Sequence, residues 1–312
     1  MGGRAVIRPF ELRDAQGAAA LFRTLEPYWI ITEAGLVHWV QTEPERARSK
    51  RWVAEVEKTI VGVAHAGLNW ATEAEDDAGL DVGVDPDYRG RGIGSELLRL
   101  TEEHLLSCGA RTLECWSHDP AGHRFLEGRG FARDRTERTW SLDPQTVDPA
   151  ELGWLEQERA REGFRLVSLR ELESRIDDVY PLWAETVADI PAEEPENNIS
   201  LEEWREGVIT RPDLSWEGSA VVLHGEQPVA LSWIEVDPID AKAEHAMTGT
   251  LRAFRRRRLA RLAKLATIRW AAENGVTKMM TGNDSTNADM LALNEHLGYA
   301  PLEPITRFVK RL

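Results

Sequence analysis

The two halves of this chain repeat one another. Three pairs of similar residues lie 165, 166 and 168 positions apart: Trp39 with Trp204, Arg89 with Arg255, and Gly130 with Gly298. Near-constant spacing across a whole chain indicates a duplicated unit. A chain of 312 residues also has the length of two ordinary domains, at roughly 100–200 residues each. We therefore expect two domains of the same fold.

Each half alternates apolar strand-like runs with helical stripes. In the first half, strands are expected at 4–10, 51–57, 59–70, 78–84 and 112–116, and helices at 15–25, 36–41, 92–108 and 121–127. In the second half, strands are expected at 164–169, 220–223, 229–236, 243–251 and 277–281, and helices at 259–272 and 287–296. This alternation predicts an α/β (α+β) fold in both halves.

The segment between the halves has a different character. It contains Pro144 and Pro149, followed by a charged, weakly amphipathic run at 152–161. We expect one domain at 1–145, a helical linker at 146–163 and a second domain at 164–312.

Composition excludes several classes of protein. The net charge of −15 disfavours nucleic acid as the main partner, because phosphate binding needs a positive surface. No apolar run approaches the ~18 residues that cross a bilayer, and the N-terminus lacks the apolar core of a secretion signal. The two cysteines, Cys108 and Cys115, have no metal-binding spacing and fit a reducing compartment. We expect a cytoplasmic protein without metal, membrane or nucleic-acid partners.

One basic segment stands out from this acidic background. Residues 252–264 carry seven basic and no acidic side chains. A small polyanionic ligand would explain such a segment. A nucleic-acid or membrane contact, or simply a solvated helix start, remains an alternative.

The strongest local motif is a glycine-rich turn at 82–94, Val-Gly-Val-Asp-Pro-Asp-Tyr-Arg-Gly-Arg-Gly-Ile-Gly. It follows an expected strand and opens an expected helix. Glycine allows positive φ and a close approach to a ligand, and the first helical amides point outward without internal partners. Such a turn suits a pyrophosphate. The dinucleotide pattern G-x-G-x-x-G after the first strand and the P-loop G-K-[ST] are both missing from the sequence.

This motif resembles a known family. Arg89-Gly90-Arg91-Gly92-Ile93-Gly94 is similar to the [QR]-x-x-G-x-[GA] loop of the GNAT superfamily of acyl-CoA-dependent N-acetyltransferases. Arg255-Arg256-Arg257-Arg258-Leu259-Ala260 occupies the same place in the second half, and Leu297-Gly298-Tyr299 resembles the family's terminal L-G-F/Y. The resemblance covers both halves and implies a tandem GNAT protein.

The resemblance implies that each domain has a mixed, mostly antiparallel sheet, flanked by helices, whose fourth and fifth strands splay apart. Acetyl-CoA is then the co-substrate, with its pantetheine arm in the gap and its pyrophosphate on the loop. The residues implied to bind it are Val82, Gly83, Val84, Arg89, Gly90, Arg91, Gly92, Ile93, Gly94, Ser95, Thr250, Arg255, Arg257, Ala260 and Asn287.

The two copies depart from the family pattern in opposite ways. In the first, Leu126 stands where the family usually has a Tyr that protonates the leaving thiolate, and Ala78 stands where some members have a catalytic Glu. In the second, Arg258 replaces the middle glycine of the loop, Glu244 falls on the catalytic-Glu position and Asn294 replaces the Tyr. The resemblance therefore points to Glu244 and Asn294 as catalytic residues.

Other side chains are candidates to remove the proton of an amine, directly or through water. In the first half these are His65, Asp76, Asp77 and His118. His245 lies beside Glu244 on the expected strand, so it points to the opposite face and is expected to be structural.

The function implied is transfer of an acetyl group from acetyl-CoA to the amine of a small acceptor. The acidic composition, including the carboxylates of 189–196, favours a cationic amine, although that stretch also fits an acidic loop. Alternatives are a non-catalytic acyl-CoA-binding protein and a scaffold of degenerate GNAT domains. We expect a monomer, in which the tandem domains form a pseudo-dimer, or a homodimer.

Overall fold

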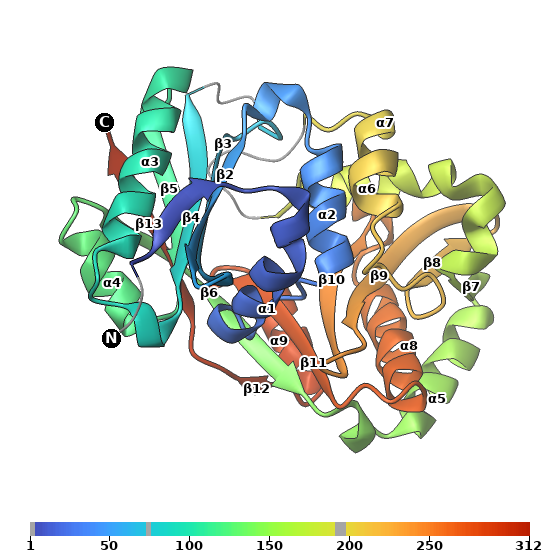
Figure 1. Ribbon diagram of the computed structural model, residues 1–312. Helices are drawn as coiled ribbons and strands as arrows, with labels where there is room; N and C mark the ends of the chain where they lie inside the picture. Colours follow the sequence, from blue (N-terminus) through green and yellow to red (C-terminus); the bar gives the residue numbers. More distant parts are fainter. Residues whose placement is uncertain (1–3, 73–75, 191–197) are drawn as a thin grey trace. The chain divides into compact units, whose positions relative to one another are not determined.

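The computed structural model describes residues 4–72, 76–190 and 198–312, which form two compact units (Figure 1). The first unit is the chain up to Glu137 together with Glu303–Leu312, and the second is Arg138–Leu302. Each unit is a mostly antiparallel sheet with flanking helices, which confirms the predicted fold class. Residues 303–312, placed in the second domain from the sequence, belong to the first unit instead.

The first unit is a sheet with the strand order β1-β2-β3-β4-β5-β13-β6. Only β4 and β5 run parallel; their neighbours pair antiparallel. The strands are β1 (Val6–Pro9), β2 (Lys50–Val56), β3 (Thr59–Leu68), β4 (Asp77–Val84), β5 (Thr112–Ser117), β6 (Ala132–Leu142) and β13 (Ile305–Arg311). The helices are α1 (Ala15–Leu25), α2 (Glu33–Thr42), α3 (Ile93–Cys108) and α4 (Pro120–Glu127).

The last strand of the chain completes this first sheet. β13 lies between β5 and β6 and pairs antiparallel with both. Phe308 at its centre is fully buried in the cluster that contains Leu105, Leu113 and Phe131. Neither β6 nor β13 was predicted from the sequence. For β6 the reason is that its outer part is mostly exposed and charged, and therefore shows no apolar alternation.

Helix α3 is delimited by two glycines in left-handed conformation. Gly92 precedes its first residue with φ of +83°, and Gly109 follows its last residue with φ of +93°. Between them Leu97, Leu98 and Leu105 form the buried stripe that packs on the sheet. Glycine adopts this backbone conformation without the steric cost that other residues meet.

The second unit repeats the arrangement with the strand order β11-β10-β9-β8-β7, and β12 pairs with residues 140–141, the end of β6 that belongs to this unit. Its strands are β7 (Phe164–Ser168), β8 (Ala220–His224), β9 (Gln227–Asp237), β10 (Lys242–Thr250), β11 (Lys278–Asp284) and β12 (Ala300–Pro301). Its helices are α5 (Pro149–Ala160), α6 (Tyr180–Val187), α7 (Leu201–Trp204), α8 (Leu259–Glu273) and α9 (Ala288–His296).

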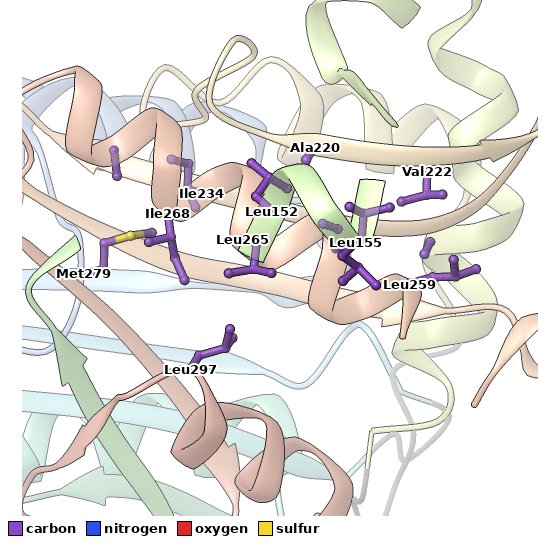
Figure 2. Packing of buried hydrophobic residues seen from close by; sticks show 14 of the residues in the cluster. Leu152, Leu155, Ala220, Val222, Ile234, Leu259, Leu265, Ile268, Met279 and Leu297 are labelled. Carbon is purple, nitrogen blue, oxygen red and sulfur yellow. The ribbon is translucent and has the colours of Figure 1, made fainter. Parts of the chain in front are cut away.

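The helix expected as a linker is part of the second unit's core. In α5, Leu152 and Leu155 are buried against α8, where Leu265 and Ile268 face the sheet (Figure 2). Asp148 caps the start of α5 by accepting a hydrogen bond from the amide of Ala150, with proline at the first helical position. The segment 143–163 therefore contains the predicted helix, packed as a structural element.

The repeat seen in the sequence holds for some landmarks only. Gly130 and Gly298 have matching φ angles of +85° and +87° at the ends of α4 and α9. Trp39 and Trp204 do not correspond in environment, because Trp39 is 40% exposed on α2 while Trp204 is fully buried at the end of α7. Conformation is thus conserved between the units at the turns, whereas packing of the tryptophans differs.

A chain of buried polar groups crosses the core of the second unit. Thr267 donates its hydroxyl hydrogen to the backbone oxygen of Lys264, so it accepts from Nε2 of His245 at 2.6 Å. Nδ1 of His245 then accepts from the hydroxyl of Tyr299 at 2.8 Å. Burial and the nearby charge of Lys264 hold the pKa of His245 well below its usual range, so this imidazole is neutral. As expected, His245 is a structural residue.

Lys264 itself is fully buried beside this chain. Its Nζ donates to Oδ1 of Asn294 at 2.7 Å, and Nδ2 of Asn294 donates to Oδ1 of Asn283 at 2.6 Å. Burial lowers the pKa of Lys264 to about 7. A leucine, Leu98, occupies the corresponding place in α3, so the second unit carries an ionisable group where the first is apolar.

Phe308→Ala should destabilise the first unit although Phe308 lies only four residues before the last residue, Leu312. Removing a fully buried phenylalanine costs about 3–5 kcal/mol of unfolding free energy. Urea unfolding measures the change, and Leu312→Ala, at the half-exposed end of the same segment, is the control. An unchanged midpoint for Phe308→Ala would contradict the placement of β13 in this core.

Lys264→Met should flatten the pH dependence of stability. In the unfolded chain the lysine titrates near ~10.4, whereas in the folded chain its pKa is about 7. Between these values the unfolded chain binds the extra proton, so the wild-type free energy of unfolding rises with pH, by on the order of 4 kcal/mol from this group. Urea unfolding from pH 6 to 10 should show the rise in wild type and in the control Lys278→Met. An equal rise in Lys264→Met would refute the assignment.

Candidate functional site

The first unit contains a cavity where two strands of its sheet separate. β4 and β5 pair only through residues 77–79 and 112–114, and beyond these positions no ladder joins the two strands. A cavity of about 440 Å³ lies along the separated parts, lined by Leu80–Val84 of β4 and by Cys115–Ser117 of β5. The splayed strands implied by the family resemblance are thus present.

The glycine-rich turn forms one end of this cavity. Gly90 and Gly92 have φ of +73° and +83°, and no atom lies within 4 Å of where a Cβ would stand on either residue. The first hydrogen bond of α3 joins the amide of Glu96 to the oxygen of Gly92, so the amides before it are outside the helical ladder. Open space beside outward-pointing helical amides is the geometry that binds an anion.

Most cofactor-binding residues predicted in the first half line this cavity. They are Val82, Gly83, Val84, Arg89, Gly90, Gly92, Ile93, Gly94 and Ser95. Arg91 is the exception, since its guanidinium lies 4.8 Å from the ring of Tyr88 and donates to the backbone oxygen of Asp87.

Two arginines support the loop from different sides. Arg89 donates from Nε to the backbone oxygen of Val84 at 3.0 Å and from Nη1 to Asp119 at 2.5 Å, which ties the loop to the end of β4. Arg129, which the sequence analysis missed, donates to the hydroxyl of Ser95 at 2.6 Å and stacks on Phe125. Arg129 follows α4, far from the motif in sequence, and only folding brings its charge to the cavity.

The cavity lining also carries acidic groups, among them one that sequence reasoning missed. Leu80 and Val82 of β4 pack toward α3, so Asp81 between them projects to the opposite face, half-exposed in the cavity lining. The sequence did contain a signal for this residue, because Asp81 is the one charged residue of the expected strand at 78–84. Asp81 lies opposite His65 in the register of β3 and β4, with 3.8 Å between its Oδ2 and Nδ1 of the imidazole.

His65 lies in a buried row of charges behind Asp81. Its Nε2 is 3.5 Å from Glu43, and Glu43 pairs with Arg51 at 2.6 Å. Burial disfavours the charged imidazole, but Asp81 and Glu43 outweigh burial and raise the pKa of His65 above its usual value. Burial likewise opposes ionisation of Glu43, yet His65 and Arg51 lower its pKa to about 2. His65 thus adjoins the cavity through Asp81.

His118 lies at the end of β5 in the cavity lining. Its Nδ1 is 3.2 Å from Oε2 of Glu26, which follows α1, and its ring meets Tyr28 edge to face. The bond to Glu26 raises the pKa of His118 above its usual value. The cavity lining therefore combines the carboxylates of Glu26 and Asp81, besides that of Asp119, with the imidazole of His118.

The remaining candidates of the first half lie elsewhere or are apolar. Asp76 accepts backbone hydrogen bonds from Arg111 and Thr112, and neither Asp76 nor Asp77 is among the cavity residues. Residues 73–75, which precede Asp76, and residues 191–196 of the acidic stretch 189–196 lie outside the described residues. Leu126, in the place of the family's Tyr, is buried and lines the cavity.

In the second unit, Glu244 occupies a different position from the one inferred. Glu244 pairs with Met280 in the parallel ladder, and the matching pair in the first unit is Gly79 with Glu114. A bulge between His245 and Met247 shifts the alignment by one residue. Glu244 therefore corresponds to Gly79 rather than to Ala78, and its side chain is 7% exposed.

The other residues predicted in the second half contact neighbouring residues of the second unit. Asn294 is fully buried between Lys264 and Asn283, and Asn287 caps α9 by accepting from the amide of Met290. The remaining members contact the loop or its neighbours: Thr250 accepts from Arg255, Arg257 lies 6.0 Å from the ring of Phe164, and Ala260 is in the first turn of α8.

Residues 4–72, 76–190 and 198–312 contain neither a metal-binding cluster nor a membrane-spanning helix. No group of three or more histidine, cysteine or acidic side chains there is arranged to hold a metal ion. No helix in the same ranges has both the length and the apolar composition to cross a membrane.

Comparison with known proteins agrees with this geometry. Residues 18–131 match the acetyltransferase (GNAT) family. The mycothiol acetyltransferase of Nocardioides sp. (strain ATCC BAA-499 / JS614) is 29% identical over 234 residues, which cover 71% of this chain and 76% of that protein.

Two solved structures share the fold over nearly the whole chain. A tandem GNAT protein from the clavulanic acid biosynthesis pathway superimposes with a TM-score of 0.74 at 19% identity, covering 99% of this chain and 98% of that one. A GCN5-related N-acetyltransferase from Sphaerobacter thermophilus gives 0.68 at 14% identity, covering 98% and 95%. Residues 18–131 thus match the acetyltransferase (GNAT) family, and the chain has the fold of a tandem GNAT protein.

Proposed function

We propose that this protein transfers an acetyl group from acetyl-CoA to the amine of a small cationic acceptor, and that the reaction takes place in the first unit. One observation carries the proposal. The cavity between β4 and β5 is lined by an anion-binding glycine turn and also by the carboxylates of Glu26 and Asp81. Such a lining offers both a place for a polyanionic donor and negative charge for a cationic acceptor.

The donor would lie along the free edge of β4. From Leu80 onward this strand pairs only with β3, so its other edge presents backbone groups to the cavity. Buried backbone groups need hydrogen-bond partners, and the amides of a pantetheine arm supply them. The pyrophosphate would then meet the amides that follow Gly92, with Arg129 nearby.

The acceptor must lose a proton before it can attack. An amine of pKa near ~10 is mostly protonated at neutral pH, and Asp81 would hold the ammonium and accept its proton, with His65 orienting the carboxylate. The free amine attacks the thioester carbonyl carbon, the C–S bond breaks and the CoA thiolate leaves, while the nitrogen releases its second proton to solvent. His118, protonated beside Glu26, would return a proton to the thiolate in place of the tyrosine replaced by Leu126.

A second candidate is an acyl-CoA-binding protein without turnover. Leu126 favours it, because an apolar side chain at the thiolate position supplies no proton. Both candidates predict acetyl-CoA binding in the first unit, and only the enzyme predicts release of free CoA thiol when an amine is added.

Gly92→Arg should abolish acetyl-CoA binding to the first unit. The arginine side chain would fill the open space beside the turn, so we expect affinity to fall at least tenfold in isothermal titration calorimetry. The left-handed conformation is unfavourable for an arginine, although Arg258 adopts it in the second unit.

Gly109→Arg provides the matched control for that variant. It places the same residue in the same left-handed conformation at the other end of α3, where the Cβ also meets open space. Gly109→Arg should bind acetyl-CoA as wild type does. Equal affinities of the two variants for acetyl-CoA would show that acetyl-CoA does not bind at this turn.

Asp81→Asn should reduce turnover with little change in acetyl-CoA affinity. Loss of a general base lowers kcat by about 10²–10⁴-fold, measured as CoA thiol release with a panel of polyamines and amino sugars. Asp76→Asn, whose residue does not line the cavity, is the control and should remain active. A wild-type rate in Asp81→Asn would exclude Asp81 as the base.

A further inference from the structure

The loop of the second unit keeps the backbone of the first loop with different side chains. Arg255 donates from Nε to the backbone oxygen of Thr250 at 3.1 Å, as Arg89 does to Val84 at 3.0 Å. The left-handed conformations of the first loop recur in the second, at Arg256 with φ of +64° and Arg258 with φ of +59°.

Keeping this shape without glycine is unfavourable. A left-handed conformation is unfavourable for a non-glycine residue, so other contacts must hold the loop of the second unit in place. The space left open beside Gly90 and Gly92 in the first unit corresponds to the Cβ positions of Arg256 and Arg258 in the second.

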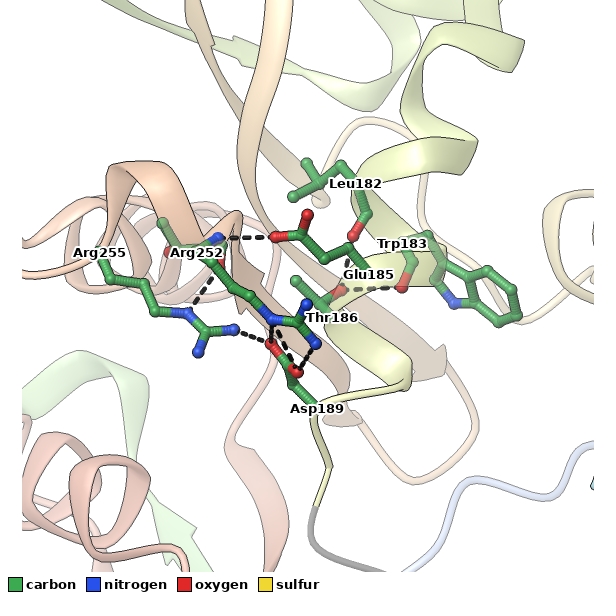
Figure 3. Close-up of polar contacts among 8 residues, drawn as sticks. Leu182, Trp183, Glu185, Thr186, Asp189, Arg252 and Arg255 are labelled. Atoms are coloured by element: carbon green, nitrogen blue, oxygen red, sulfur yellow. Dashed lines mark hydrogen bonds and ion pairs between the residues drawn. The ribbon is translucent and has the colours of Figure 1, made fainter. Parts of the chain in front are cut away.

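Those contacts come from carboxylates that follow or belong to α6. Asp189 receives hydrogen bonds from Nε of Arg252 at 3.0–3.1 Å, and also from the terminal nitrogens of Arg252 and Arg255 (Figure 3). Oε1 of Glu185 accepts from the backbone amide of Arg252 at 2.7 Å. One carboxylate therefore binds two guanidinium groups of the loop, and a second binds its first amide.

Asp189 is fully charged in this setting. The hydrogen bonds from Arg252 and Arg255 lower its pKa below the usual range. Its place is set by the packing of α6 on β10, because Thr186 lies against Gly249, where a Cβ would come within 2.5 Å of it. An anionic group is thus held against the cationic loop by the fold itself.

The first unit has no counterpart of this contact. Pro86 stands where the second unit has Arg252, so that position has neither a guanidinium nor an amide hydrogen to donate. The partner of Arg89 is Asp119, which comes from the turn between β5 and α4 on the other side of the loop. We call the hydrogen bonds that Asp189 and Glu185 accept from the loop the clasp. Among the described residues, the clasp occurs in the second unit alone.

We infer that the carboxylate of Asp189 occupies the place of a ligand's phosphate on the arginine loop of the second unit. The loop is then an anion site that a carboxylate of the same chain already fills. The inference rests on the proposed function in that the first unit is then the one that takes acetyl-CoA. The ligand excluded is a pyrophosphate-bearing molecule such as acyl-CoA, and the same loop becomes a site for that class once the carboxylate is removed.

Asp189→Asn tests this inference, because the amide keeps the shape of the carboxylate and removes its charge. The change is made in the full chain carrying Gly92→Arg, which closes the first loop. Asp177→Asn in the same background is the matched control, since Asp177 also binds an arginine, Arg205, through two hydrogen bonds on the surface of the second unit.

Calorimetric titration with inorganic pyrophosphate, and separately with acetyl-CoA, provides the readout. We expect the Asp189→Asn chain to bind pyrophosphate at least tenfold more tightly than the Asp177→Asn chain, with one site per molecule. Equal affinities in the two chains would overturn the inference. Circular dichroism of both chains verifies folding, and charge reversal at the same position, Asp189→Lys, should bind pyrophosphate at least as tightly as Asp189→Asn if that variant is folded.

The two proposals fail in different ways. If wild type binds no acetyl-CoA, the proposed function is refuted, while the comparison of Asp189→Asn with Asp177→Asn in pyrophosphate still decides the clasp. If wild type binds acetyl-CoA and both double variants bind pyrophosphate equally, only the clasp is refuted.

Discussion

The parting of β4 from β5 is the constraint on which the first unit's site depends. Two parallel strands that paired along their whole length would satisfy each other's backbone groups and leave no room between them. Here the ladder stops at Gly79 and Glu114, and the cavity begins where it stops. β13 supports this arrangement, because it pairs with the far edge of β5 and keeps that strand in the sheet after it leaves β4.

The loop between strand and helix has the same backbone shape in the two units but a different arrangement of charged side chains. In the first unit the turn is made of glycines, and its arginines bind groups beside the cavity. In the second unit arginines occupy the turn, and their charges are matched by Asp189 on one side of the loop. The gap beside β10 also differs, since Asn294 and Lys264 form a buried pair where the first unit has Leu126 and Leu98. Duplication preserved the geometry of the loop while its chemistry changed.

Sequence reasoning reached the fold class, most elements and the glycine turn, because these depend on local signals. Periodicity marks helices and strands, and glycine marks left-handed turns. It missed β6 and β13, whose pairing joins residues far apart in the chain. It also missed Asp81 and Arg129, since a charged residue inside a strand or after a helix has no local mark of the cavity that it lines. The bulge in β10 misaligned Glu244 by one residue.

The amino-acid sequence alone therefore identified two copies of one family's fold and the turn suited to a pyrophosphate, since both are encoded in contiguous residues. Only the tertiary structure decided which charges meet. Asp81 with His65, Glu26 with His118, and Asp189 with Arg252 are pairs separated by 16 to 92 residues. Electrostatic interactions depend on distance in space, and that distance is settled only when sheets and helices pack.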